Sequence, residues 1–152
     1  MILKRLVLIA CLLFACNLLV TAWNSSTTKA LETPTVQFIS ADELKTRVAK
    51  NQPVTIIDVR ATDSFADSER KIKGAIHVKL RRLRYRLSFA PLKGVPRNSE
   101  IVTYCACPND ELSIKAAQVL TESGFTHARV LKGGWHEWLK LNGPVEHIPK
   151  GM

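Results

Sequence analysis

Two cysteines separated by a single residue are the side chains in this sequence best placed to do chemistry. Cys105 directly follows residues 101–104 (Ile-Val-Thr-Tyr), which have the composition of a buried strand, and Cys107 lies two residues further on. A helix is predicted to begin near Ser113, so both cysteines belong to a strand–loop–helix connection. Free backbone N–H groups and the positive end of the helix would point into this loop and stabilise a thiolate. The pattern therefore favours a sulfur nucleophile over a buried, inert cysteine.

Metal binding is not expected at this loop. A Cys-x-Cys pair needs further ligands, and the histidines show no zinc-ligand spacing; they are His77, His127, His136 and His147. We therefore expect neither a metal nor another cofactor.

The segments around the cysteine loop alternate between strand and helix patterns. Ser40 can cap a helix, because Glu43 follows three residues later. Other helices are predicted at 80–87, from 113 to Gly124, and from Gly133 through Trp138. Short apolar runs predict the strands at 36–39, 54–57, 74–78, 101–104 and 128–131. Strands separated by helices in one domain indicate an α/β fold with an open parallel sheet, whose ligands bind at the carboxyl ends of the strands.

Composition limits the class of protein. The chain has 152 residues, of which 46% are hydrophobic, so it supports one folded domain and excludes wholesale disorder. Four cysteines are too few for a disulfide-dense scaffold of this length. The net charge of +9 is unevenly placed, since residues 70–97 hold ten Lys and Arg and no acidic residue. The rest of the chain is close to neutral.

The N-terminal segment reads as an export signal or a membrane anchor helix. Lys4 and Arg5 precede an apolar run over residues 6–23, and Val20-Thr21-Ala22 offers a small-residue cleavage site. The run is also long enough to remain as an anchor, and lipidation at Cys16 is a third, less favoured alternative. We expect a leader at 1–22, a linker at 23–35 and the folded domain at 36–148. The domain is then exported to the periplasm or another extracytoplasmic space, either soluble after cleavage or tethered to the inner membrane.

Several segments together resemble the rhodanese (sulfurtransferase) family. They are residues 56–60 (Ile-Ile-Asp-Val-Arg), 72–76 (Ile-Lys-Gly-Ala-Ile), 101–105 (Ile-Val-Thr-Tyr-Cys), 131–138 (Leu-Lys-Gly-Gly-Trp-His-Glu-Trp) and 144–145 (Pro-Val). The resemblance implies a rhodanese-like open parallel sheet flanked by helices and a catalytic cysteine that carries a persulfide. Sulfane sulfur would pass from a small anionic donor, such as thiosulfate or a polysulfide, to a thiol-type acceptor. Asp58 and Arg60, at the end of a matched strand, are expected to support the site through a salt bridge or a loop hydrogen bond that holds the neighbouring turn, and not to act directly in catalysis.

The cysteine loop departs from the family pattern C-x-x-x-x-R-[ST]. It has no arginine, and its residues are Cys105, Ala106, Cys107, Pro108, Asn109, Asp110, Glu111, Leu112 and Ser113. Matching from the strand makes Cys105 the nucleophile, which we favour slightly because loops absorb length changes. Matching back from Ser113 makes Cys107 the nucleophile. The missing arginine leaves an alternative function open, a catalytically weak binding or redox-sensing module.

Two neighbouring cysteines also permit redox chemistry. A persulfide on one could be attacked by the other, which releases sulfide and leaves a disulfide.

The basic segment allows three interpretations: a solvated helix face, attraction of the anionic donor by Arg81, Arg82, Arg84 and Arg86, or docking onto acidic lipid or a partner. Membrane association is also expected through the N-terminus if the leader remains. Nucleic acid is not an expected partner, because no recognition motif is present.

Overall fold

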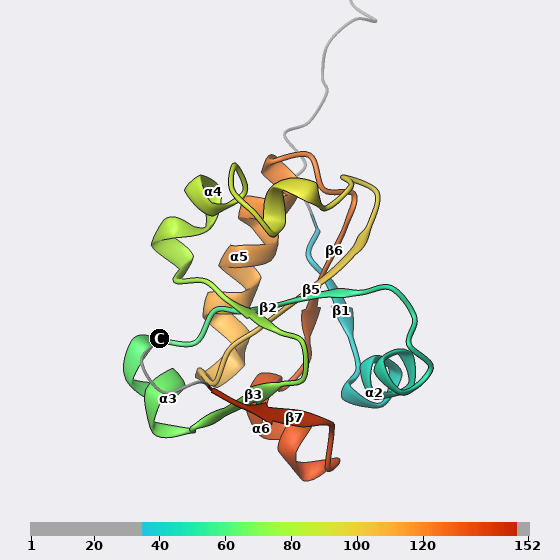
Figure 1. The fold of residues 1–152 in the computed structure, drawn as a ribbon, viewed down its shortest axis with the longest axis vertical. Coiled ribbons are helices and arrows are strands. Elements are labelled where there is room, and N and C mark those ends of the chain that lie inside the picture. Colours follow the sequence, from blue (N-terminus) through green and yellow to red (C-terminus); the bar gives the residue numbers. More distant parts are fainter. Residues whose placement is uncertain (1–34, 149–152) are drawn as a thin grey trace, which may run out of the picture. The chain divides into compact units, whose positions relative to one another are not determined.

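The computed structural model describes residues 35–148, and the predicted leader at 1–22 and nearly all of the linker lie outside this part. Its centre is a five-stranded sheet in the order β1-β6-β5-β2-β4, in which every neighbouring pair is parallel (Figure 1). The strands are β1 (Gln37–Ile39), β2 (Thr55–Asp58), β4 (Ile76–His77), β5 (Glu100–Tyr104) and β6 (His127–Leu131). The predicted open parallel α/β sheet is therefore confirmed.

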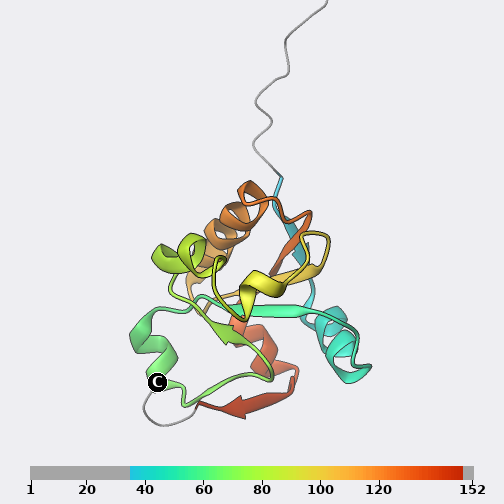
Figure 2. The same ribbon diagram turned by 45° about the horizontal axis from the view of Figure 1, so that its top comes forward.

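Helices cover both faces of this sheet. The elements α2 (Ala41–Ala49) and α6 (Gly134–Lys140) pack on one face, and α4 (Leu83–Arg86) and α5 (Glu111–Glu122) pack on the other. Figures 1 and 2 show α4 beside α5, with α2 away from both. The remaining helix is α3 (Thr62–Asp67), and a separate antiparallel pair is formed by β3 (Arg70–Ile72) and β7 (Val145–His147). Within residues 35–148, no helix has the length and apolar character that crossing a membrane requires.

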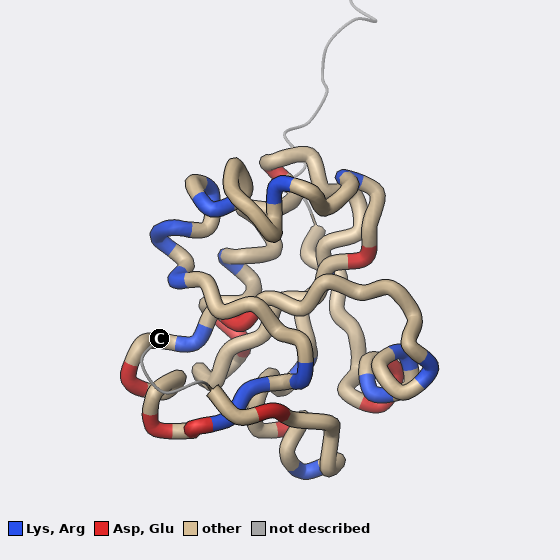
Figure 3. The backbone as a smooth tube through the Cα atoms, in the orientation of Figure 1, with Lys and Arg blue, Asp and Glu red and all other residues tan. Residues whose placement is uncertain are grey.

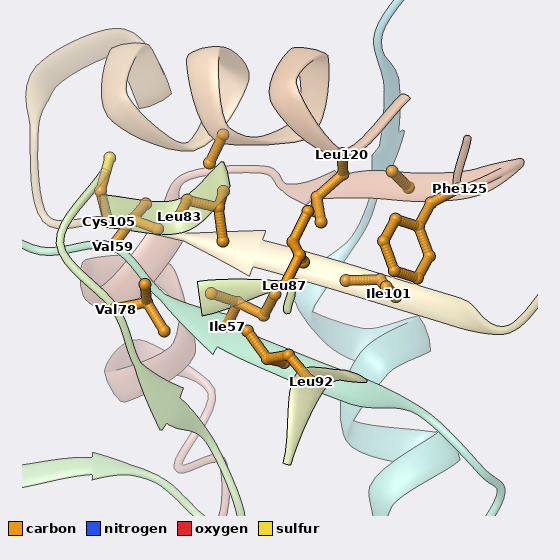
Figure 4. Close-up of a cluster of buried hydrophobic side chains, with 12 residues drawn as sticks. Ile57, Val59, Val78, Leu83, Leu87, Leu92, Ile101, Cys105, Leu120 and Phe125 are labelled. Carbon is orange, nitrogen blue, oxygen red and sulfur yellow. The ribbon is translucent and has the colours of Figure 1, made fainter. Parts of the chain in front are cut away.

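Alternation along the central strands builds two hydrophobic cores. Ile57 and Ile101 point into the core under α4 and α5, whereas their neighbours Ile56 and Val102 belong to the core under α2 and α6. Figure 4 shows the first core, with Cys105 beside Val59 at one end and Phe125 at the other. Both faces of the sheet are buried, which is why its strands are nearly continuous apolar runs.

Two of the predictions about helices agree with the structure, and a third differs in length. Ser40 caps α2, and its hydroxyl accepts a hydrogen bond of 3.1 Å from the backbone N–H of Glu43. Trp135 and Trp138 are core residues of α6, as their spacing predicts, and are 5% and 0% exposed. The helix predicted at 80–87 is shorter than expected. It consists of a 3-10 turn, Leu80–Arg82, followed by the single α-helical turn of α4.

Asp58 and Arg60 form a fully buried ion pair at the carboxyl end of β2. A guanidinium nitrogen of Arg60 lies 2.7 Å from the carboxylate, and the hydroxyl of Tyr104 donates to the same carboxylate oxygen at 2.6 Å. The imidazole of His77 approaches the other oxygen to 3.9 Å. The Arg60 guanidinium also lies 4.4 Å from the ring centre of Trp135, so this pair ties β2 and β5 to α6.

These contacts shift the ionisation of both acidic groups. Burial of the Asp58 carboxylate raises its pKa, but His77, Arg60 and Tyr104 together outweigh burial and hold the pKa below its ordinary value. Burial raises the pKa of Tyr104, and the neighbouring charge of Asp58 raises it further. A carboxyl group with a lowered folded-state pKa contributes stability above its unfolded pKa, and that stability is lost as pH falls through the folded value.

We predict that Asp58→Asn lowers the free energy of unfolding by about 3–5 kcal/mol at pH 7, because it leaves the Arg60 charge buried without its partner. It should also flatten the decrease of stability between about pH 5 and pH 2. Urea titrations over this pH range measure both effects. Glu146→Gln is the matched control, since it breaks the more exposed pair with Lys71 and should cost less than about 1 kcal/mol. Equal effects of the two variants would contradict the prediction.

Candidate functional site

The two cysteines lie at the carboxyl edge of the parallel sheet, as predicted, but in different surroundings. Cys105 is the first residue after β5, is fully buried, and belongs to the core under α5. Cys107 is half-buried and lines a pocket. A disulfide bond joins the two sulfur atoms. Of the two cysteines, only Cys107 lines this pocket.

The start of α5 directs backbone N–H groups toward Cys107. Asn109 and Asp110 both have left-handed backbone conformations, with φ values of 57°, and they turn the chain from the 3-10 segment Pro108–Asp110 into α5. The backbone N–H of Leu112 then points to the Cys107 sulfur, at a nitrogen–sulfur distance of 3.3 Å. The first turn of this twelve-residue helix carries partial positive charge, so this position favours a sulfur anion.

Asp110 lines the pocket, and its carboxylate also fixes the far side of the loop. Its carboxylate is largely buried and accepts a hydrogen bond of 2.8 Å from the backbone N–H of Gly133. The carbonyl oxygen of Cys105 accepts another, also 2.8 Å, from the N–H of Trp135. These two bonds hold the loop against the turn between β6 and α6.

Ser113 connects the loop to the sheet. Its hydroxyl donates to the carbonyl of Asp110 at 2.8 Å and lies 3.5 Å from the Cys105 sulfur. Its own carbonyl accepts from the Thr103 hydroxyl at 2.9 Å. The serine therefore supports Cys105 from the first turns of α5.

The pocket beside Cys107 has a volume of about 570 Å³ and combines groups from three parts of the chain. The loop contributes Cys107 and the residues 108–110, and the start of α2 contributes Ser40, Ala41 and Asp42. The β6–α6 turn and α6 with its cap contribute Lys132, Gly133, His136, Glu137 and Leu141. His136 also lies over the loop, with its Nε2 atom 3.2 Å from the carbonyl oxygen of Ala106.

Lys132 and His136 are pocket residues that the sequence did not single out. Both flank the Gly133-Gly134 turn, which follows β6 at the same edge of the sheet as the cysteines. Adjacent parallel strands bring their carboxyl ends together, so the pairing of β5 with β6 is the signal that places them here. The sequence alone does not show that β5 and β6 are neighbours in the sheet.

The residues predicted to attract an anion lie in α4 and in the 3-10 turn before it, and they do not line this pocket. Arg84 forms an ion pair of 2.6 Å with Glu122, the last residue of α5, whereas the cysteine loop lies at the first residue of that helix. Twelve residues of α-helix span about 18 Å. Asp58 and Arg60 lie behind the loop in the buried network and support it from the neighbouring strand. Glu111 lies at the start of α5, where it pairs with Lys115.

Among residues 35–148, no group of three or more His, Cys, Asp and Glu side chains could hold a metal ion.

The fold and the cysteine loop define a domain of the sulfurtransferase type. The family model for the rhodanese-like domain matches residues 40–141, and the chain belongs to this family. Its predicted resemblance is thereby confirmed.

Solved structures agree with this assignment. The chain is 32% identical to a crystal structure of the Alr3790 protein from Anabaena sp., with a TM-score of 0.62, over 72% of this chain and 82% of that one. BH2092 from Bacillus halodurans is 26% identical, with a TM-score of 0.62, over 73% and 77% of the two chains. The human single-domain sulfurtransferase TSTD1 is 24% identical and shares the fold, with a TM-score of 0.58 over 69% and 96% of the chains. No curated protein sequence matches the chain.

We predict that Gly134→Ala lowers the free energy of unfolding by roughly 2–4 kcal/mol and displaces the cysteine loop. Gly134 has a φ of +49°, and a Cβ atom there would overlap the carbonyl oxygen of Cys105. Gly124→Ala is the control, because its φ is +90° but no atom lies within 4 Å of the added carbon. It should cost only about 1–2 kcal/mol, the strain of the left-handed backbone. Urea unfolding measures both, and equal losses would contradict the predicted contact.

Proposed function

We propose that this protein is a sulfurtransferase that carries sulfane sulfur as a persulfide on Cys107. The observation that supports this choice most strongly is the position of Cys107, which lines the pocket and whose sulfur receives the N–H of Leu112 at the start of α5. Cys105 has no comparable access, because it is fully buried under α5. The strand-based argument that slightly favoured Cys105 considered only chain length and not access to a ligand.

The reaction begins from the reduced dithiol. The Cys107 thiolate attacks the outer sulfur of a small anionic donor such as thiosulfate, the donor's S–S bond breaks, and sulfite leaves with the electron pair. A new S–S bond now joins the transferred sulfur to Cys107 as a persulfide. An acceptor thiolate then attacks the outer sulfur, takes it as its own persulfide, and restores the Cys107 thiolate.

Cys105 offers a second route for the persulfide. Its thiolate can attack the inner sulfur, that of Cys107, which forms the Cys105–Cys107 disulfide and expels the outer sulfur as hydrosulfide. An external dithiol must then supply two electrons to reduce this disulfide, becoming oxidised to a disulfide itself. The sulfur atoms of the two residues are already close enough to bond without a change in β5, as their disulfide demonstrates.

The pocket supports a small donor and a thiol acceptor, although it lacks the arginine common in the family. Lys132 provides positive charge and His136 contributes an imidazole ring, whereas Asp42, Asp110 and Glu137 contribute carboxylates. The negative charge of a bound persulfide would therefore depend strongly on the backbone N–H groups at the start of α5.

We place this activity outside the cytoplasm, with the protein either soluble or tethered to the inner membrane. The proposal rests on the positively charged start and the apolar run of residues 6–23. A Cys105–Cys107 disulfide is also more readily maintained in an oxidising compartment than among cytosolic reductants.

A second candidate function is a redox-sensing or thiol-binding module with weak sulfur transfer. Two observations favour it: the loop has no arginine, and carboxylates of Asp42 and Glu137 line the pocket. Such a module would use the dithiol–disulfide exchange of Cys105 and Cys107 without accumulating a persulfide.

The cysteine assignment predicts distinct products for two serine variants. After reduction and exposure to thiosulfate or polysulfide, Cys105→Ser should retain an adduct of about 32 Da on Cys107, because no second thiol resolves it. Cys107→Ser should lose sulfur transfer by at least about 100-fold. Intact and peptide mass spectrometry, with sulfite and sulfide release, measures these outcomes. An adduct on Cys105 alone would contradict the assignment, and disulfide exchange without any adduct would favour the redox module.

The pocket charge predicts a change in KM. Lys132→Gln combined with His136→Gln should raise the KM for thiosulfate by roughly three- to tenfold, because both side chains line the space beside Cys107. Steady-state sulfite production measures this change. Lys115→Gln is the charge control, since Lys115 is exposed on α5 and pairs with Glu111. An equal increase in both variants would show that only the general charge of the protein matters.

A further inference from the structure

The surface of α4 opposite the core carries an exposed pair of aromatic rings. Tyr85 and Phe89 are 65% and 43% exposed, and their ring centres lie 4.6 Å apart. Leu83 and Leu87 alternate with them along the chain and are buried against α5. Burial of the leucines therefore requires that the aromatic side chains face outward. Folding needs only the buried leucines, so it does not explain why the outward positions carry aromatic residues.

Positive charge surrounds these rings. Residues 79–97 contain seven Lys and Arg and no Asp or Glu. In the part of the chain that the structure describes, Arg84 is the one member of this set that forms an ion pair, with Glu122. Figure 3 shows the chain through α4 with several blue positions and no red one. We call Tyr85, Phe89, Arg81, Arg82, Arg86 and Lys93 the aromatic–basic surface.

This surface lies away from the cysteine pocket. Arg84 reaches Glu122 at the end of α5 that is remote from the loop, about 18 Å along the helix. The end of α5 and the start of β1 lie at the amino edge of the sheet, where Figure 1 also shows α4. In sequence, only residues 24–34 separate the first described residue from the apolar run 6–23.

We propose that the aromatic–basic surface binds the surface of a bilayer that contains anionic phospholipid. Aromatic rings are favoured at the level of the lipid headgroups, and clustered Lys and Arg are attracted to anionic lipid. An apolar run that enters the membrane would keep the domain close to the bilayer. The cysteine pocket, at the opposite edge, remains open to solutes in this orientation. The inference does not depend on the sulfurtransferase chemistry.

Hydrogen exchange of the full chain with vesicles tests this proposal at the level of peptides. We expect amides within residues 80–93 to exchange at least fivefold more slowly with vesicles containing about one-third phosphatidylglycerol than with pure phosphatidylcholine vesicles. Peptides of α2, on the other face of the sheet, should not change. The slowing should disappear at about 1 M salt, where the Debye length is only about 3 Å.

Matched variants separate the surface from the apolar run, which all of them retain. Tyr85→Ser with Phe89→Ser, and Arg82→Gln with Lys93→Gln, should each abolish most of the slowing. Phe38→Ser is the aromatic control, because Phe38 is 47% exposed on β1, outside the surface. Circular dichroism and the thermal midpoint of each variant check that it folds.

Three outcomes would overturn the proposal. Equal slowing by both kinds of vesicle would show that the surface does not recognise anionic lipid. Slowing without vesicles that increases with protein concentration would identify a second copy of the chain as the occupant. Slowing by duplex DNA but not by anionic vesicles would identify a different polyanion.

Discussion

The hydrogen bonds that join the cysteine loop to the β6–α6 turn constrain the whole candidate site. The carbonyl of Cys105 accepts from Trp135 at one end of the loop, and the carboxylate of Asp110 accepts from Gly133 at the other. Both bonds depend on β5 and β6 being parallel neighbours, because only then do their carboxyl ends meet. The segment between the two bonds, which includes Cys107, is therefore fixed at both ends, and the left-handed backbone of Gly134 permits the close approach.

The difference between the two cysteines follows from the alternation of side chains at the end of β5. Tyr104 points to the face of α6 and reaches Asp58, so its successor Cys105 must point to the face of α5, where the core buries it. Cys107 lies beyond the strand and is free of this alternation. A spacing of two residues thus gives one cysteine inside the core and one at its edge that lines the pocket, and a disulfide joins them.

Local physical chemistry made much of this fold predictable from the sequence. The cap at Ser40 depends on neighbouring residues alone and so could be expected. The same holds for Asn142, which follows the end of α6 with a φ of 49°, because asparagine tolerates the left-handed backbone of a helix cap. The pairing of β3 with β7 could not, because each strand has three residues and the partners lie more than 70 positions apart in the chain. The helix α3 was also missed, since it has six residues and no side-chain cap.

The candidate site shows the same division. Residues 105–113 were found because cysteines after a strand have a direct chemical meaning. The placement of Lys132 and His136 depends on strand order, which no local pattern contains.

The structure changes the interpretation of the protein's positive charge, because it shows where the basic residues lie relative to Cys107. Ten basic residues in one segment suggested a replacement for the missing loop arginine, but Arg84 lies at the far end of α5 from Cys107. Inside the pocket, the positive charge of Lys132 is accompanied by the carboxylates of Asp42, Asp110 and Glu137, which offset part of its attraction for an anion. Stabilisation of negative charge on sulfur then falls to the backbone N–H groups at the start of α5.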